Sequence, residues 1–251
     1  MKRGNDMLSI FTDGGINHGT SCGGAILLDI PEKNEEFNDI DVIKGSFKIC
    51  EDSTNNEAEL FGILQSLYLI EPENETPVII FSDSEYAVKT LTIWIFDWFK
   101  NYRANRNSGL VIPSMMTKGG KPVQNCKLIC TIISTIVHNN LQVRFKNVRG
   151  HMNPNNENDV NMQASYFKKS NNLKKDISFS FSKFLCTYNE LIDKSVGKQL
   201  KRYKCHEKIN TNPDFITEIR HDGHFEDNLY KKYYLLNTAI MNKYKSLIGK
   251  K

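Results

Sequence analysis

Short runs in which apolar and polar residues alternate fill much of the first fifty positions of the chain. Residues 7–13 alternate loosely and residues 42–49 alternate clearly, while residues 22–29 between them form an apolar run after a Gly-rich turn. Alternation with a period of two is typical of strands whose two faces meet different surroundings. Because the three runs follow one another along the chain, we expect an antiparallel meander of three strands.

The spacing of the apolar residues then lengthens to that of a helix. Thr54 is a suitable N-cap residue, and the helix that it predicts is followed by a β-branched run at residues 77–82 that is typical of a buried strand. Residues 84–99 predict an aromatic-rich helix. The apolar residues at helical spacing after Thr54 are Leu60, Ile63, Leu64, Leu67 and Ile70.

The second half of the pattern completes a mixed sheet. Residues 101–121 are polar, with Gly, Pro and basic side chains, and predict a loop or protrusion. Residues 123–137 and 156–168 predict helices, and residues 141–148 between them predict a fifth strand. This order of elements is typical of an α/β fold with a five-stranded sheet, three antiparallel strands then two parallel ones, flanked by helices.

A polar stretch at residues 170–175 suggests a boundary between two parts of the chain. We expect one domain over residues 1–169 and a basic, mostly helical extension over residues 170–251. Residues 179–196 and 229–248 of the extension predict helices, with a loop over residues 206–227 between them.

Charge divides the chain at the same place. Residues 170–251 hold 16 Lys and Arg against 9 Asp and Glu, a net charge of +7, which leaves −3 for residues 1–169. A basic segment suggests contact with a polyanion or with a protein partner. A solvated, lysine-rich helical face explains the same composition.

Composition excludes several classes of protein. No apolar run approaches the roughly 20 residues that a membrane span needs, and the N-terminus leads into no signal-peptide core. The six cysteines lack the paired spacing of a disulfide framework, so we expect a reducing, intracellular setting. A zinc site is disfavoured by the irregular spacing of its candidates, Cys205, His206, His221 and His224.

Three acids stand where a carboxylate is unusual. Asp13 and Asp83 each end an apolar run that predicts a buried strand, and Glu59 lies in the first turns of the helix that Thr54 opens. A buried, unpaired charge is costly, and several converging carboxylates are usually compensated by a divalent cation with oxygen ligands. The adjacent ends of two neighbouring strands would place Asp13 beside Asp83.

These acids belong to an ordered set of motifs that resembles the type 1 ribonuclease H family over residues 7–168. The resemblance implies Asp13, Glu59 and Asp83 as metal ligands, two Mg²⁺ per site with Mn²⁺ as a possible substitute, and a mobile His151 that handles protons or product departure. The motifs are Ser9-Ile-Phe-Thr-Asp-Gly-Gly15, Thr54-Asn-Asn-Glu-Ala-Glu-Leu60, Val78-Ile-Ile-Phe-Ser-Asp-Ser84 and Arg149-Gly-His-Met-Asn-Pro154.

The chain departs from the family at the fourth metal ligand. The family carries an Asp ten residues after the His, and Asn161 stands there in this chain. Asp159 lies roughly 200° around a helix from Asn161 and cannot replace it without a shift. We treat Asn161 as a fourth ligand through its amide oxygen. An inactivating Asp→Asn change and a catalytically silent binder remain open alternatives.

The resemblance also implies a set of residues that contact nucleic acid. Asparagine amides can bond 2′-hydroxyls in the minor groove of an RNA/DNA hybrid, an aromatic pair lines the channel of the DNA strand, and a basic protrusion contacts phosphates. Core packing is the alternative role of the two tryptophans. The implied residues are Asn17, Thr54, Asn55, Asn56, Trp94, Trp98, Lys121, Gln124 and Asn125.

The resemblance therefore implies an endonuclease, which we expect to be a monomer of the cytoplasm, the nucleus or a viral replication compartment. It would hydrolyse the RNA strand of RNA/DNA hybrids and leave 3′-hydroxyl and 5′-phosphate ends. Two rivals stay open, a hybrid-binding protein without catalysis and a structure-selective DNA nuclease of the same fold. Asn161 makes the first rival plausible, while Thr54 to Asn56 and the tryptophan pair favour a hybrid over a DNA junction.

Overall fold

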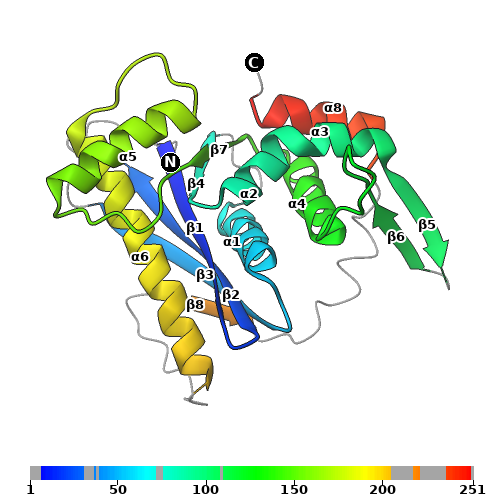
Figure 1. The fold of residues 1–251 in the computed structure, drawn as a ribbon, viewed down its shortest axis with the longest axis horizontal. Coiled ribbons are helices and arrows are strands. Elements are labelled where there is room, and N and C mark those ends of the chain that lie inside the picture. The colour runs from blue at the N-terminus through cyan, green and yellow to red at the C-terminus, as the bar shows by residue number, and fades with distance from the viewer. Residues whose placement is uncertain are drawn as a thin grey trace.

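The computed structural model describes residues 7–30, 37, 40–71, 76–107, 110–204, 217–220 and 236–249. A twisted sheet forms its centre, with strands in the order β7-β4-β1-β2-β3-β8 (Figure 1). The strands are β1 (Met7–Asn17), β2 (Thr20–Ile30), β3 (Val42–Glu51), β4 (Val78–Ser82), β7 (Val143–Asn147) and β8 (Thr217–Arg220).

The strand directions confirm the predicted sheet and add one strand to it. β1, β2 and β3 are antiparallel neighbours, and β4 and β7 run parallel to β1. β8 pairs in parallel with β3 at residues 217–220. The prediction of a loop is therefore wrong at these four residues, because pairing with an edge strand can order a segment that has no strong pattern of its own. The rest of the predicted loop lies outside the described residues.

Helices cover both faces of this sheet (Figure 1). α1 packs on one face, with α4 against α1 and α8 against α4, and α6 packs on the other face, with α5 against it. Polar caps begin several of them: the Thr54 hydroxyl accepts from the backbone N–H of Glu57 at 3.3 Å. The helices are α1 (Asn55–Leu69), α4 (Cys126–His138), α5 (Glu157–Ser170), α6 (Phe179–Lys204) and α8 (Thr238–Leu247).

The helix predicted over residues 84–99 is present in several pieces. α2 (Glu85–Lys89) begins at Ser84, whose hydroxyl accepts from the N–H of Ala87 at 3.2 Å. A π-helical turn at Thr90–Trp94 leads into α3 (Ile95–Trp98), and a 3₁₀ turn comes after it. A π turn inserts an extra residue and rotates the next helical turns about the axis, and such turns are found frequently at functional sites.

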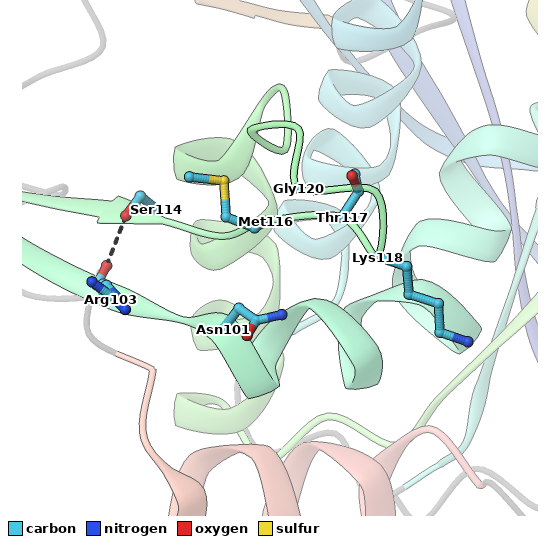
Figure 2. A pocket seen from close by; sticks show the side chains of 7 residues that line it. All are labelled: Asn101, Arg103, Ser114, Met116, Thr117, Lys118 and Gly120. Atoms are coloured by element: carbon cyan, nitrogen blue, oxygen red, sulfur yellow. Dashed lines mark hydrogen bonds between the residues drawn. The ribbon is translucent and has the colours of Figure 1, made fainter.

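The predicted protrusion is a two-stranded hairpin of β5 (Arg103–Asn107) and β6 (Leu110–Ser114). It points away from the main sheet in Figure 1. At its base, the Ser114 hydroxyl donates to the carbonyl of Arg103 at 3.4 Å (Figure 2). The hairpin and the following loop enclose a hollow of about 500 Å³, lined by Asn101, Arg103, Ser114, Met116, Thr117, Lys118 and Gly120 (Figure 2).

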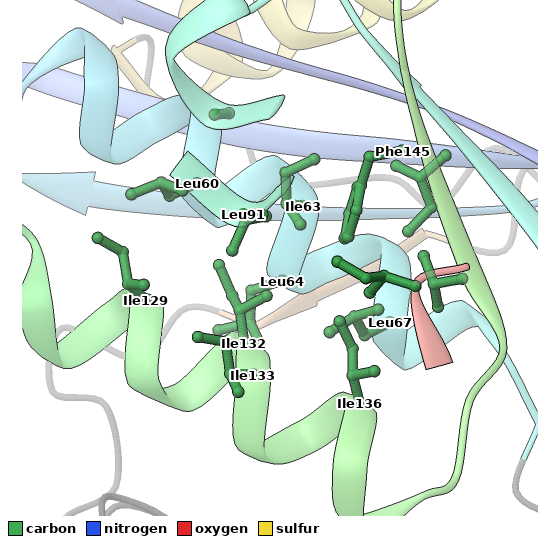
Figure 3. Packing of buried hydrophobic residues seen from close by; sticks show 14 of the residues in the cluster. Leu60, Ile63, Leu64, Leu67, Leu91, Ile129, Ile132, Ile133, Ile136 and Phe145 are labelled. Carbon is green, nitrogen blue, oxygen red and sulfur yellow. The ribbon is translucent and has the colours of Figure 1, made fainter. Parts of the chain in front are cut away.

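Alternation along the central strands builds a separate core on each face. Ile10 and Ile80 face α1 and α4, whereas Phe11 and Phe81 face α6. The first core is aliphatic, and Leu64 of α1 lies beside side chains of α4 in Figure 3. The second is aromatic, and Phe11 stacks on Phe81 with ring centroids 4.7 Å apart.

α6 completes the second core although it lies beyond the predicted boundary at residue 169. Its apolar side chains recur at helical spacing and are buried on the sheet. They are Phe184, Leu185, Ile192, Val196 and Leu200. α6 of the basic extension therefore packs on the sheet of the first domain. The boundary itself stays a prediction.

In the described part of the chain, no helix is both long and apolar enough to cross a membrane. Five cysteines there carry free thiols, namely Cys22, Cys50, Cys126, Cys130 and Cys186. The four residues weighed as a zinc set, Cys205, His206, His221 and His224, lie outside the described residues.

Candidate active site

The three acids singled out in the sequence come together at one end of the central strands. Asp13 lies on β1, Asp83 directly follows the neighbouring parallel strand β4, and Glu59 belongs to α1. One carboxylate oxygen from each lies within 4.8 Å of the other two. The predicted convergence is confirmed.

Glycine at position 14 allows α1 to approach β1 closely enough for this. A Cβ atom added to Gly14 would lie 2.3 Å from the backbone N of Glu59, closer than side-chain atoms pack in folded proteins. Gly62, one turn further along α1, meets the Asp13 carbonyl in the same way, at 2.7 Å. Two glycines thus set the spacing of helix and strand, and that spacing brings Glu59 to Asp13.

The arrangement is electrostatically costly without a cation. Burial, followed by the charges of Asp83 and Asp193, raises the pKa of Asp13 from 3.8 to about 7. Burial and the charges of Asp13 and Asp83 raise the pKa of Glu59 well above its usual value, and burial raises that of Asp83. Glu59 Oε2 is buried without a hydrogen-bond partner in the described structure. Converging hard oxygen donors with an open lone pair fit a divalent cation of the Mg²⁺ type.

His151 lies at the rim of this centre. Its backbone is left-handed, with φ of 57°, and its side chain is 84% exposed. Gly150 precedes it and lets the loop pass Asp83, since an added Cβ would lie 2.5 Å from Asp83 Oδ2. The loop thereby holds an imidazole next to the acids while leaving it open to solvent.

Two residues of the centre were missed in the sequence, and both lie on α6. The Asn189 side chain donates from Nδ2 to Asp83 Oδ2 at 3.3 Å. Asp193 Oδ2 lies 3.6 Å from His151 Nδ1. Their spacing of four places them one helical turn apart on one face, but no local motif marks that face as facing the acids.

Asn161 lies in the second turn of α5 with an exposed side chain. The buried face of α5 is formed by Val160, Gln163 and Phe167, and Gln163 Oε1 accepts from the backbone N–H of Arg149 at 2.9 Å. The assignment of Asn161 as a metal ligand stays a prediction.

The residues predicted to read the minor groove lie at the start of α1 and the end of β1. Asn55 and Asn56 are exposed in the first turn of α1. Thr54 is exposed as well, and its hydroxyl caps the helix. Asn17 is the last residue of β1, paired with Thr20 across the turn, and is partly buried. Contact of these four side chains with nucleic acid stays a prediction.

The two tryptophans form a pair with different surroundings. Their ring centroids lie 5.7 Å apart at an angle of 40°. Trp98 packs against the aliphatic core, whereas Trp94 has an edge contact with Tyr86 at 6.1 Å. Both are partly buried. Of the two rings, Trp98 therefore belongs to the core, and the role of Trp94 in binding nucleic acid stays a prediction.

The loop after the β5–β6 hairpin carries exposed cations in and next to the predicted contact segment. Lys118 and Lys121 are exposed, and Lys118 Nζ lies 3.9 Å from Asp97, which also pairs with Lys100 at 2.7 Å. Gln124 is exposed, and Asn125, with φ of 57°, precedes α4 and is partly buried.

Known proteins share this combination of sheet and acids. The profile of the RNase H family matches residues 5–165. Ribonuclease H of Actinobacillus succinogenes is 31% identical over 145 residues, which cover 57% of this chain and 78% of that protein. Ribonuclease H of Haemophilus influenzae is 27% identical over 144 residues, with the same two shares. The family match spans more than half of the chain, so the chain belongs to the ribonuclease H family.

Solved structures show weaker similarity. LC9-RNase H1, a type 1 RNase H with the type 2 active-site motif, is 18% identical with a TM-score of 0.44, and the match covers 68% of this chain and 76% of that one. LC11-RNase H1, solved in complex with an RNA/DNA hybrid, is 15% identical with a TM-score of 0.36, with coverage of 57% and 85%. α6 lies beyond the segment that the family profile matches.

Proposed function

We propose that the protein is an endonuclease that hydrolyses the RNA strand of RNA/DNA hybrids by a two-metal-ion mechanism, with 3′-hydroxyl and 5′-phosphate products. Membership of the ribonuclease H family supports the activity. The observation that carries the mechanism is the convergence of Asp13, Glu59 and Asp83 within 4.8 Å. Buried carboxylates with raised pKa values hold hard cations because the cations neutralise their mutual repulsion.

Each part of the site then has a role that its chemistry allows. Asp13, Glu59 and Asp83 would hold Mg²⁺, or Mn²⁺ in its place. Bound divalent cations supply Lewis-acid chemistry to phosphodiester hydrolysis. His151, exposed at the rim, can take up or release a proton near the leaving group.

Segments around the acidic centre would select the substrate. Asn55 and Asn56 present amides that can both donate to and accept from a 2′-hydroxyl, which distinguishes RNA from DNA. Lys118 and Lys121 add phosphate contacts that carry no sequence preference. Position 161 holds an amide where the family carries a carboxylate. The second candidate function is therefore a hybrid-binding protein without catalysis.

Cleavage of labelled hybrid, DNA duplex and single-stranded RNA in Mg²⁺ tests the proposal directly. We expect internal cuts in the RNA strand of the hybrid and none in the other two substrates. Asp83→Asn removes a charged ligand and should reduce the rate by at least about a thousandfold while the circular dichroism spectrum is retained. Asp176→Asn is the control, because Asp176 is 86% exposed and pairs only with Lys168 among its described ion pairs.

The outcomes separate the candidates. Hybrid binding without cleavage by the unaltered chain would favour the silent binder. Cleavage of duplex DNA in preference to the hybrid would favour the DNA nuclease. Undiminished turnover by Asp83→Asn would overturn the assignment of the acids.

A further inference from the structure

α6 forms one wall of the acidic centre and is held firmly there. Val196 and Leu200 follow Asn189 and Asp193 along the same face and pack on β1 and β2. An added Cβ at Gly15 would lie 3.0 Å from Val196 Cγ1, so the helix lies directly on the strand that carries Asp13. The Ser182 hydroxyl donates to the carbonyl of Val160 and joins α6 to α5.

Asn189 is a buried amide with unfinished hydrogen bonding. It is 3% exposed, and its Nδ2 donates to Asp83 Oδ2 at 3.3 Å. Its Oδ1 has no hydrogen-bond partner in the described structure. Buried polar atoms without partners are rare in native proteins, and one beside a carboxylate cluster points to a polar ligand there.

Asp193 stands between the buried acids and the solvent. Its side chain is 47% exposed, and Oδ2 lies 3.6 Å from His151 Nδ1. Its charge is among the causes that raise the pKa values of both Asp13 and Asp83. It is not one of the three acids whose oxygens converge within 4.8 Å, which places it at the edge of the cluster.

We infer that Asp193 supplies the fourth carboxylate of the metal site, in place of the acid that the resemblance led us to expect at Asn161, and that Asn189 positions Asp83. Asp13, Glu59 and Asp83 together carry −3 when ionised, and Asp193 brings the charge to −4, which equals that of two divalent cations in magnitude. This inference rests on the proposed function. It makes α6, outside the family match, part of the catalytic centre.

Metal binding by the full chain without nucleic acid tests this assignment. Titration calorimetry with Mg²⁺ and with Mn²⁺ should show that Asp193→Asn weakens binding by about tenfold or more, as the loss of a metal-site carboxylate or its close support does. Glu190→Gln is the matched control, because Glu190 lies on the same helix and pairs with Lys194 at 2.7 Å. We expect its metal affinity to equal that of the unaltered chain.

A compensating change tests whether Asp193 takes over the role expected at position 161. Adding Asn161→Asp to Asp193→Asn should restore Mg²⁺ affinity to within about threefold of the unaltered chain, because the carboxylate count returns to four. Failure to restore it would overturn the exchange of roles. Unchanged Mg²⁺ affinity in Asp193→Asn, with slower cleavage, would also overturn the proposal and leave Asp193 as a partner of His151.

The positioning role of Asn189 has its own readout. Asn189→Leu keeps the branched shape of the side chain and removes the donor to Asp83, so kcat should fall at least tenfold. KM for the hybrid should stay unchanged, since the Asn189 side chain is buried. Unchanged kcat, with only the melting temperature lowered, would overturn that role. If Asp83→Asn also left metal binding unaffected, the proposed function would fail, and not merely the contribution of α6.

Discussion

Asp13 shows how the surroundings of a single residue set its chemistry. It is 8% exposed, lies beside two further carboxylates and has its pKa raised from 3.8 to about 7. A carboxyl group with a pKa raised by folding is more easily protonated in the native state than in the unfolded chain. The site therefore makes the metal-free protein less stable as its acids ionise.

The pH dependence of stability in EDTA follows from this. The contribution of Asp13 is fully present below its unfolded pKa, near 4, and is lost as pH rises through about 7. Asp13→Asn imitates the protonated form. It should raise the free energy of unfolding at pH 8 by roughly 2–4 kcal/mol, with the gain shrinking toward pH 4.

Denaturant unfolding at several pH values in EDTA measures this difference. Asp176→Asn, at an exposed position, should show no comparable dependence. A gain from Asp13→Asn that is the same at pH 4 and pH 8 would contradict the raised pKa. Adding Mg²⁺ should reduce the gain at pH 8, because a cation that binds only the native site stabilises the unaltered protein.

At the scale of elements, the segment from α2 to α3 presents the tryptophan pair through a π-helical turn. Trp98 is tied to the aliphatic core, whereas Trp94 contacts Tyr86 and Trp98 at the edge of that core. The two rings are adjacent, so their separate substitution distinguishes packing from binding.

Trp98→Ala should lower the free energy of unfolding by roughly 2–4 kcal/mol, because it removes a large ring packed on the core. Trp94→Ala should cost less stability and raise KM for the hybrid severalfold, since base or sugar stacking on an aromatic ring contributes about 1–3 kcal/mol. Thermal unfolding and steady-state cleavage measure the two effects. Equal losses of stability with unchanged KM would assign both rings to the core.

At the scale of the whole molecule, α6 joins the extension to the sheet. Without it, the apolar face of the sheet that carries Phe11, Phe81 and Ile26 would be open to water. A chain ending at residue 169 should therefore be poorly soluble and largely lose its cooperative thermal transition. A soluble, cooperative and active 1–169 fragment would show instead that the extension is dispensable. Size-exclusion chromatography of the 1–169 fragment measures its solubility and aggregation, and scanning calorimetry measures its thermal transition.

The basic charge of the extension is tested in the full chain. Lys198 and Lys201 are exposed on α6, away from its buried stripe. If they bind phosphates, replacing both by Ala should reduce the slope of log affinity against log salt by about 0.7–0.9 for each lysine that neutralises a phosphate. Filter binding of a long hybrid at several salt concentrations measures that slope. An unchanged slope would make them a solvated face.

The sequence alone determined the five strands β1 to β4 and β7, most of the helices and the three converging acids. These features are local. Apolar residues recur every two positions in strands and every three to four in helices, and Asp13 and Asp83 each end an apolar run. Their neighbouring positions follow from the order of the strands. The resemblance of the ordered motifs to one family added the expected chemistry, and the family match confirmed that membership.

The tertiary structure decided what α6 contributes. Asn189 lies 106 residues from Asp83 along the chain, yet donates a hydrogen bond to it. The apolar stripe of α6 predicts an amphipathic helix with one buried face. The stripe does not indicate which surface of the protein that face packs against. Only the packing of Val196 and Leu200 against β1 and β2 turns Asn189 and Asp193 toward the acids. Contacts between residues so far apart in the chain leave no local sequence pattern. For this reason Asn189 and Asp193 were recognised only in the tertiary structure.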